Sequence, residues 1–208
     1  MKPSPTPLAR ALLENSHQQR PTPLTAFRLA RRWWLKGKRL NLSAMAKELG
    51  VTRVTLMRWV GTREMLLGEV LWSLYREMLD RHRPLAQQQA GEDPVAFLVG
   101  LYHAINVELL ASGPLQNFLR QDPRFALQVL TSNVSPLPRR LVALWQALLD
   151  EETSAGRIKP RMDNNHLAYF IVQLGESTVY SDLICGQQPQ LEPGNMAVRL
   201  LLSPHPAP

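Results

Sequence analysis

Apolar residues recur at intervals of three and four along most of this chain, which is the spacing of amphipathic α-helices. Helical patterns dominate, and segments with the alternation of β-strands are hard to find. Proline stands at or near the first turn of several helical segments, where it is tolerated. The predicted helices, apart from one short pair described below, cover residues 25–36, 62–82, 94–111, 114–120, 123–132, 138–154, 163–185 and 193–202. The sequence therefore predicts an all-α protein.

Helix ends carry their own signals. Gly37 is expected to end the first helix, since glycine readily leaves helical geometry. Thr62 is expected to cap the long helix that follows the short pair. Pro84 is expected to terminate that long helix near residue 82, because proline lacks a backbone N–H and restricts the residue before it. The residues of the first helix expected to face inward are Leu24, Phe27, Ala30, Trp33 and Trp34.

Residues 42–61 fit two short helices held at a fixed angle by a tight turn, the helix-turn-helix that reads DNA. Ala46 is small where the helices would cross. Gly50 stands where the chain must turn, a place that favours positive φ. Thr52 is a natural N-cap for the second helix. The apolar residues expected between the helices are Met45, Leu49, Val51, Leu56 and Trp59.

A helical hairpin can also be mere packing geometry with no role in DNA binding. Charge favours the DNA interpretation. Residues 1–83 hold 16 Lys and Arg against 6 Asp and Glu, whereas residues 84–208 hold 8 against 11. A basic N-terminal part on a mildly acidic remainder is typical of a nucleic-acid-binding head joined to a body with another task.

The second helix of the motif supplies the candidate DNA contacts. Arg53 is the best candidate to read a base edge, because guanidinium pairs bidentately with guanine. Thr55 and Arg58 suit phosphates, while Lys36, Lys38 and Arg39 are either solvated surface or phosphate contacts. The candidate contacts of the second helix are Thr52, Arg53, Val54, Thr55, Met57 and Arg58.

The segment 42–67 resembles the signature of TetR-type transcriptional regulators. The matching residues are Met45-Ala46, Gly50-Val51-Thr52, Thr55-Leu56, Thr62-Arg63-Glu64 and Leu66-Leu67. The resemblance implies a three-helix DNA-binding head and a C-terminal helical domain for ligand binding and dimerisation. It also implies that Arg63 clamps a phosphate. Met57 stands where the family usually has a phosphate-contacting Tyr, and Val60 where it usually has Phe.

We therefore expect a mobile Pro-rich arm at residues 1–23, including a short helix at 8–15. A DNA-binding domain at 24–68 and a regulatory domain at 69–208 follow. One recognition helix reads few base pairs, so a two-fold dimer on a palindromic operator is expected. The resemblance implies dimerisation through residues 163–185 and 193–202.

Two stripes run along the first of these segments, and the pattern leaves open which one faces the partner. The first stripe holds Leu167, Ile171, Leu174 and Thr178. The second holds Tyr169, Phe170, Gln173, Glu176, Ser177 and Tyr180.

The resemblance also implies a pocket for a small effector between helices of residues 70–180. Its aromatic groups suggest an apolar or aromatic ligand. His103 could equally be a hydrogen-bonded core residue, Glu176 could pair with an arginine across the dimer, and a sensor without ligand also fits. The candidate lining residues are Tyr75, Tyr102, His103, Asn106, Trp145, Tyr169, Gln173 and Glu176.

No catalytic site is predicted. The five histidines and Cys185 show no metal-ligand spacing, and no nucleotide-binding or hydrolase motif occurs, so we expect no metal and no cofactor. A single cysteine suits a reducing compartment, and with no signal peptide or apolar run long enough for a membrane we expect a cytoplasmic protein.

The predicted function is a homodimeric repressor that a ligand releases from DNA. One alternative is a structural or chromosome-organising DNA-binding protein without a ligand. Another is a sensor that has lost DNA affinity, for which Met57 is the one hint.

Overall fold

The computed structural model describes residues 21–181 and 186–203, and every regular element in these two ranges is an α-helix. The all-α prediction is confirmed. The expected helix at 8–15, most of the Pro-rich arm and Cys185 lie outside the described residues. The helices are α2 (Pro23–Leu35), α3 (Leu42–Glu48), α4 (Arg53–Val60), α5 (Arg63–Ala90), α6 (Pro94–Ala111), α7 (Gly113–Gln121), α8 (Pro123–Thr131), α9 (Leu137–Ser154), α10 (Asn164–Val179) and α12 (Leu191–Leu202).

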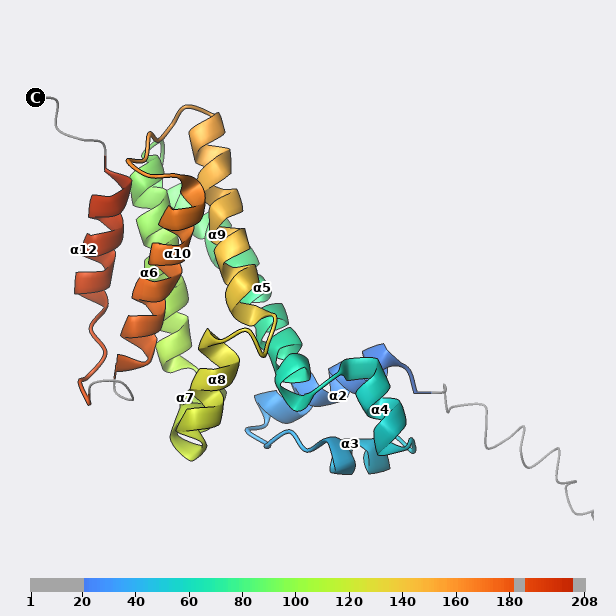
Figure 1. Ribbon diagram of the computed structural model, residues 1–208. Helices are drawn as coiled ribbons and strands as arrows, with labels where there is room; N and C mark the ends of the chain where they lie inside the picture. The colour runs from blue at the N-terminus through green and yellow to red at the C-terminus, as the bar shows by residue number, and fades with distance from the viewer. Residues whose placement is uncertain (1–20, 182–185, 204–208) are drawn as a thin grey trace, which may run out of the picture.

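Helices α2, α3 and α4 form a small unit, here called the head, at one end of the molecule (Figure 1). The hydroxyl of Thr22 caps α2 by accepting a hydrogen bond from the backbone N–H of Thr25 at 3.2 Å. Leu24 is 53% exposed, so its expected inward position is wrong: it lies in the first turn, before the part of α2 that packs. The buried residues of α2 are Ala26, Leu29, Ala30 and Trp34.

The predicted helix-turn-helix is present as α3 and α4. Gly50 has φ of 67°, the left-handed conformation that glycine adopts at no steric cost. The Thr52 hydroxyl accepts a hydrogen bond from the backbone N–H of Thr55 at 3.1 Å, so it caps α4 as expected. The buried residues of the pair are Leu42, Met45, Ala46 and Leu56.

The long helix α5 begins at the predicted cap, Thr62, but does not end at Pro84. It continues to Ala90 with the proline inside it, so the expected helix end is wrong. Pro84 and Asp80, whose carbonyl loses its partner, are both exposed, and water can satisfy that carbonyl. Burial of Leu79 and Ala86 on either side holds the helix against the rest of the molecule.

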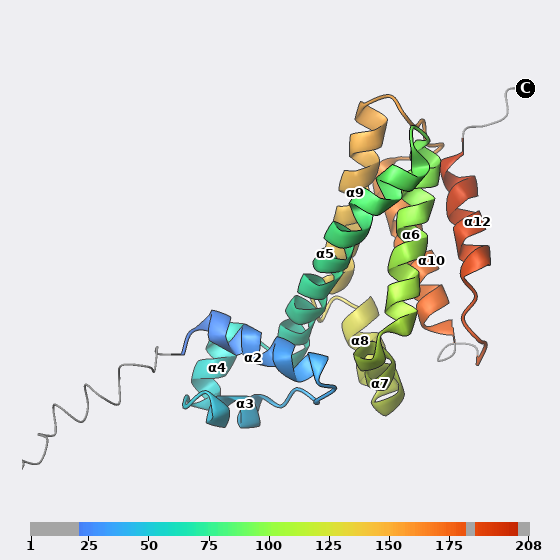
Figure 2. The same ribbon diagram turned by 180° about the vertical axis from the view of Figure 1, so that it is seen from behind.

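The remaining helices form what we call the body. Helices α6, α9, α10 and α12 lie beside the far end of α5, while α7 and α8 form a short pair between this bundle and the head (Figures 1 and 2). The fully buried residues at the centre of the bundle include Leu98, Leu101, Ile105, Leu149, Leu167, Ile171 and Val198.

Gly68 of α5 lies close to the start of α9. A Cβ atom there would lie 2.7 Å from Pro136 Cδ and 2.8 Å from Ser135 Cβ, which is too close for any side chain. One residue further on, the carboxylate of Glu69 accepts two hydrogen bonds from Arg140, at 2.6 and 2.9 Å. This contact fixes the first part of α5 against the start of α9.

By length and composition alone, α6 could cross a membrane, so the expectation that no segment could is wrong. In the structure α6 packs against α5, α10 and α12, and its Leu98 and Leu101 are fully buried. These are the contacts of a core helix.

The two stripes of α10 differ in exposure. The helix ends at Val179 rather than 185, and residues 182–185 lie outside the described residues. In the first stripe, Leu167, Ile171 and Thr178 are buried and Leu174 is half-buried. In the second, the exposed residues are Tyr169, Phe170, Gln173 and Ser177, whereas Glu176 is half-buried and Tyr180 is buried.

Replacing Pro84 by alanine should stabilise the protein. The new N–H at position 84 can bond to the carbonyl of Asp80, and the helix loses a strongly unfavourable residue, so the free energy of unfolding should rise by about 1–3 kcal/mol. Urea denaturation measures the change. Gln87→Ala, an exposed control on the same helix, should change stability by less than about 0.5 kcal/mol. A loss of stability in Pro84→Ala would mean that packing of α5 requires the proline geometry.

Candidate DNA-binding face and ligand cavity

One face of α4 is buried and the opposite face is open to solvent. Leu56 is fully buried, and Trp59 and Val60 pack half-buried against the same core. Because one face of a helix repeats every three or four residues, this anchors the other face outward. The outward residues are Arg53, Val54, Met57 and Arg58, all exposed, with Val54 77% exposed.

The capping threonines of α4 are partly engaged with each other. The hydroxyl oxygens of Thr52 and Thr55 lie 2.9 Å apart, in addition to the capping bond from the Thr55 backbone. Thr55 is half-buried and Thr52 is exposed. The cap therefore orders the start of α4.

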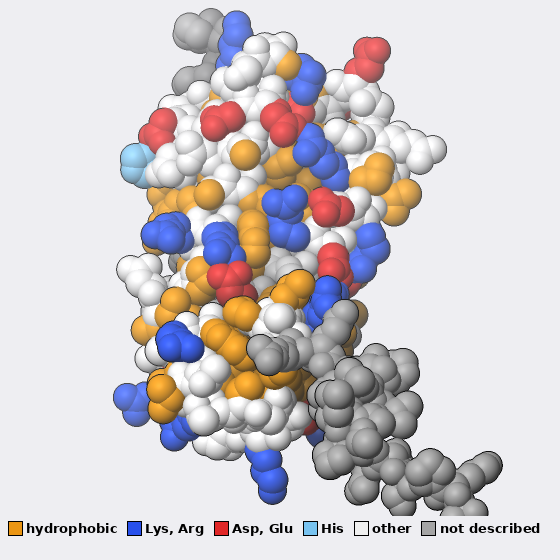
Figure 3. All heavy atoms as spheres, turned by 90° about the vertical axis from the view of Figure 1, so that its right-hand side faces the viewer, with side chains coloured by type: hydrophobic (Ala, Val, Ile, Leu, Met, Phe, Trp, Pro, Cys, Tyr) orange, Lys and Arg blue, Asp and Glu red, His pale blue; other side chains and the backbone are white. Residues whose placement is uncertain are grey.

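Three of the arginines expected at DNA surround one hollow of the surface. Arg39, Arg53 and Arg63 line it, together with residues 40–43 at the start of α3. Residues 21–63, which comprise the head and the first residue of α5, hold ten Lys and Arg and one acidic residue, Glu48. Figure 3 shows Lys and Arg side chains on the lower part of the molecule, where the head lies. The hollow is thus a concentrated site of positive charge.

Arg63 also reaches the body. Its guanidinium carbon lies 3.9 Å from the centre of the Phe125 ring on α8, a cation–π contact. Burial lowers the pKa of Arg63, and the positive charge of Arg39 lowers it further. Arg39 in turn pairs with Asp122 at 3.2 Å, and Lys38 lies over the ring of Trp33. Of these predicted DNA contacts, Arg39 also joins the head to the body, and Arg63 joins the start of α5 to α8.

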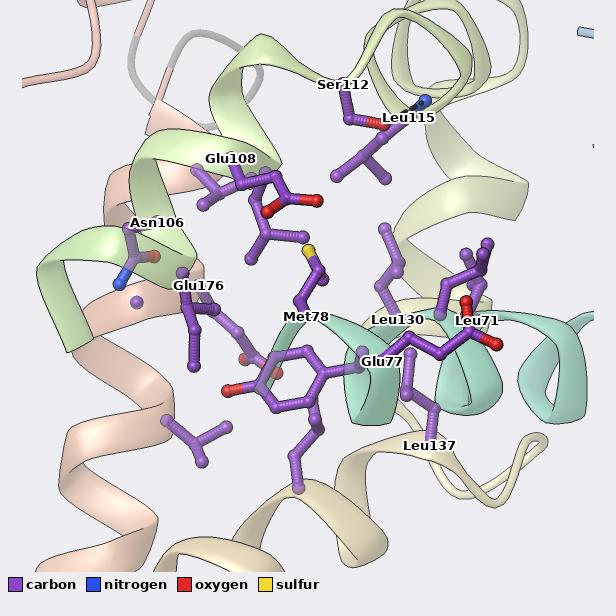
Figure 4. A pocket seen from close by; sticks show the side chains of 18 of the residues that line it. Leu71, Glu77, Met78, Asn106, Glu108, Ser112, Leu115, Leu130, Leu137 and Glu176 are labelled. Atoms are coloured by element: carbon purple, nitrogen blue, oxygen red, sulfur yellow. Dashed lines mark hydrogen bonds between the residues drawn. The ribbon is translucent and has the colours of Figure 1, made fainter. Parts of the chain in front are cut away.

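A cavity of about 410 Å³ lies within the body (Figure 4). Its walls come from α5, α6, α9 and α10, with contributions from α7 and α8. Helix α2 of the head also lines it, through Arg31, Trp34 and Leu35. The exposed lining residues Leu35, Glu77 and Arg81 show that the cavity opens between α2 and α5.

Five of the eight predicted lining residues lie on this cavity: Tyr75, Tyr102, Asn106, Trp145 and Glu176. They come from four different helices, and the fold brings them together.

The other three do not line the cavity, and their predicted placement is wrong. His103 is exposed on the outer side of α6, where its Nδ1 lies 2.9 Å from Asn195 Nδ2 of α12. Tyr169 and Gln173 are exposed on the outer face of α10, turned away from Leu167 and Ile171. Helical periodicity shows that residues share a face, but it cannot show which face meets a cavity.

The buried polar groups of the cavity mostly bond to one another. Trp145 Nε1 donates to the Tyr75 hydroxyl at 2.9 Å, and Asn106 Nδ2 donates to the backbone carbonyl of Tyr102 at 2.8 Å. Burial raises the pKa values of Tyr75, Tyr102 and Tyr180 above that of a free phenol. These phenols therefore remain neutral.

Three lining groups keep a buried polar atom without a hydrogen-bond partner among the described residues: Arg31 Nε, the Tyr102 hydroxyl and Glu176 Oε1. Of these residues, Glu176 is the acid. Burial raises the pKa of its carboxyl to about 7, although a hydrogen bond from Gln173 lowers it in part. Gln173 Nε2 donates to Oε2 at 2.9 Å, whereas the buried Oε1 has no hydrogen-bond partner among the described residues. A buried carboxylate oxygen without a donor is unfavourable in a folded protein.

Ion pairs border the opening of the cavity. Arg31 of α2 pairs with Glu77 of α5, and Arg81 of α5 pairs with Glu108 of α6. His82 Nε2 also lies 2.7 Å from Glu108. The sequence patterns did not predict this rim, nor that α2 lines the cavity. No local signal could have indicated them, because the paired residues lie 46 and 27 positions apart.

The body matches a known family. A family model described as "Tetracyclin repressor-like, C-terminal domain" matches residues 94–203, more than half of the chain. The chain belongs to the TetR family. The family suggested by residues 42–67 is thus confirmed by a separate part of the sequence.

Two solved structures are similar to this chain. The transcriptional repressor QsdR of R. erythropolis, from the TetR family, has a TM-score of 0.77 and 21% identity, over 89% of this chain and 97% of its own. The fatty acid degradation regulator FadR of Bacillus halodurans has a TM-score of 0.47 and 18% identity, over 88% and 96%. Among curated protein sequences, none matches the chain. The likeness to QsdR shows that the two chains share a fold.

Glu176 gives this TetR-family protein a pH dependence that a variant can reveal. With its pKa raised from 4.5 to about 7, the folded protein holds the proton more tightly than the unfolded chain between those values. The contribution of Glu176 to stability therefore falls as pH rises through this window. Glu176→Gln should remove the loss and gain roughly 1–3 kcal/mol at pH 8 and little near pH 4.

Urea denaturation of both proteins at pH 4, 6 and 8 measures this difference. Glu92→Gln, an exposed carboxyl outside the cavity, serves as the control and should give a difference independent of pH. A gain in Glu176→Gln that is equal at all three pH values would contradict the raised pKa.

Proposed function

We propose that this TetR-family protein is a homodimeric, sequence-specific repressor that a small ligand releases from a palindromic operator. The observation that carries the proposal is the outward face of α4 beside the hollow lined by Arg39, Arg53 and Arg63. An exposed helix face with adjacent cationic groups suits a DNA major groove and its flanking phosphates.

The roles on this face follow from side-chain chemistry. Arg53 can pair with a guanine edge, and the exposed Val54 and Met57 can contact thymine methyl groups. Arg58 and Lys38 suit phosphates. Arg63 can donate in-plane N–H groups to a phosphate while the face of its guanidinium lies over Phe125.

The exposed second stripe of α10 supports the dimer. Tyr169 and Phe170 are each more than 40% exposed, and on α12 Met196 is 58% and Leu200 is 65% exposed. Large apolar groups rarely stay open to water when they are clustered, and α10 and α12 pack beside each other. A second copy of the chain related by two-fold symmetry would cover them.

Ligand response has a physical route through α2. The cavity wall includes Arg31 and Trp34 of the head, and Arg31 is paired with Glu77 of α5. A ligand at this wall would act on the angle between head and body, and so on the spacing of the two recognition helices. Repression is the mode that the likeness to QsdR, a transcriptional repressor, supports.

Selection of binding sites from a random duplex library tests the proposal as a whole. Enrichment of a palindrome with half-sites about one helical turn apart is the expected result. Salt-sensitive binding to all sequences without a motif would instead favour a structural DNA-binding protein. Absence of binding would favour a sensor that has lost DNA affinity.

Arg53→Ala should relax base preference at one position of each half-site and weaken operator binding by about 1–3 kcal/mol per contact. Fluorescence anisotropy with the selected operator and with single-base variants measures both effects. Lys159→Ala removes an exposed positive charge between α9 and α10, far from the head, and should change neither. An equal loss on every sequence would make Arg53 a phosphate contact.

Leu200→Glu should convert the dimer to monomer, because it places a charge in the centre of the proposed apolar interface. Analytical ultracentrifugation measures the mass. The matched control is Leu85→Glu, which changes a leucine of similar exposure on α5 and should leave the dimer intact. If both variants sediment as the wild type does, the interface lies elsewhere.

A further inference from the structure

The unpartnered oxygen of Glu176 gives the cavity a chemical preference. Figure 4 shows Glu176 among the residues that surround the cavity, on the α10 wall. Its Oε1 is buried and accepts no hydrogen bond from a described residue. A donor carried by a ligand would offset the cost of burying this oxygen, and a cationic donor would do so best.

Both arginines that line the cavity already form ion pairs with carboxylates other than Glu176. The charged lining residues are Arg31, Glu77, Arg81, Glu108 and Glu176, an excess of one acidic group. Both arginines are paired, Arg31 with Glu77 and Arg81 with Glu108. Only Glu176 remains without an opposite charge among these five, so the wall around it favours a positive ligand.

The rest of the cavity wall is mostly apolar. Tyr75 and Trp145 bond to each other, and Asn106 bonds to the backbone. The Tyr102 hydroxyl has no partner among the described residues, but it is neutral and so attracts a cation less than the Glu176 carboxylate does. The apolar lining residues include Leu71, Met78, Leu115, Leu130, Leu137, Leu141 and Ile171. A volume of about 410 Å³ lies within the range of small-molecule sites.

We propose that the cavity binds an apolar amine, whose protonated nitrogen donates to Glu176 Oε1 while its hydrocarbon part lies against the leucines. The inference rests on the proposed ligand-binding function and adds the chemical class of the ligand. Because a hydrogen bond between two charged groups is about twice as strong as a neutral one, an amine should bind more tightly than the alcohol of equal length.

Isothermal titration calorimetry with three probes of one chain length tests the class. The full-length protein is titrated at pH 8 with n-octylamine, 1-octanol and octanoate, so that Glu176 is ionised and the amine remains protonated. We expect octylamine to bind one per chain, at least about tenfold more tightly than octanol, a difference of about 1.4 kcal/mol. Octanoate should bind more weakly than either.

Glu176→Gln isolates the carboxylate. The variant should lose the advantage of octylamine over octanol while its affinity for octanol stays within about twofold of the wild type. Glu92→Gln, which removes an equal charge from the surface, should behave as the wild type does. Octanol therefore reports that the cavity is intact in each variant.

The remaining outcomes separate two failures. Equal binding of octanol and octylamine, or tightest binding of octanoate at the paired arginines, would overturn the amine while keeping a ligand cavity. Failure of all three probes to bind would overturn both the amine and the proposed ligand response. An altered dimer in Glu176→Gln, with amine binding unchanged, would assign Glu176 to the interface between copies.

Discussion

The continuity of α5 is the constraint on which the rest of this structure depends. One helix of 28 residues begins at the Thr62 cap beside the recognition helix and runs through the body to Ala90. Gly68 lets it approach the start of α9 so closely that no side chain would fit, and Glu69 is fixed by Arg140 in the next position. A displacement of the body along α5 must therefore reach the base of α4, since only Gly61 and Thr62 separate the two helices.

The head has a second attachment, made of aromatic and charged groups. Trp34 of α2 packs edge to face on Phe118 of α7, with ring centres 5.2 Å apart, and Phe118 packs likewise on Phe125 of α8 at 5.8 Å. Phe125 also contacts Arg63, whose guanidinium lies over its ring. Since Trp34 also lines the cavity, one side chain belongs both to this attachment and to the proposed ligand site. A rearrangement of the cavity wall at Trp34 would thus change the contact of Trp34 with Phe118, which attaches the head to α7.

Local sequence signals predicted where helices begin and end better than which side of each helix faces its neighbours. Thr52, Thr62 and Asp163 mark helix starts correctly, because a capping side chain bonds within its own turn. The helix end predicted at Pro84 was wrong, because burial of Leu79 and Ala86 outweighs the one backbone hydrogen bond that proline removes.

The cavity residues likewise divide into those that the local pattern predicts and those that depend on how each helix is oriented. Tyr75 and Trp145 were predictable as aromatic groups on packed helices, whereas His103, Tyr169 and Gln173 required knowledge of which side of α6 and α10 faces inward. The contribution of Arg31 depends on how the head docks on the body, which no pattern within a single helix contains.

Two different surfaces of the molecule meet on helix α10. Gln173 is exposed with the stripe that we propose as the dimer interface, while Glu176, one turn later, lines the cavity, and the two side chains share a hydrogen bond. A ligand cation that draws the Glu176 carboxylate toward the cavity would weaken its bond to Gln173 and so change a residue of the proposed interface. The spacing of two recognition helices depends on both the angle within each chain and the angle between chains. Because the cavity is lined by α2 as well as by α10, a ligand bound in it could change both of these angles.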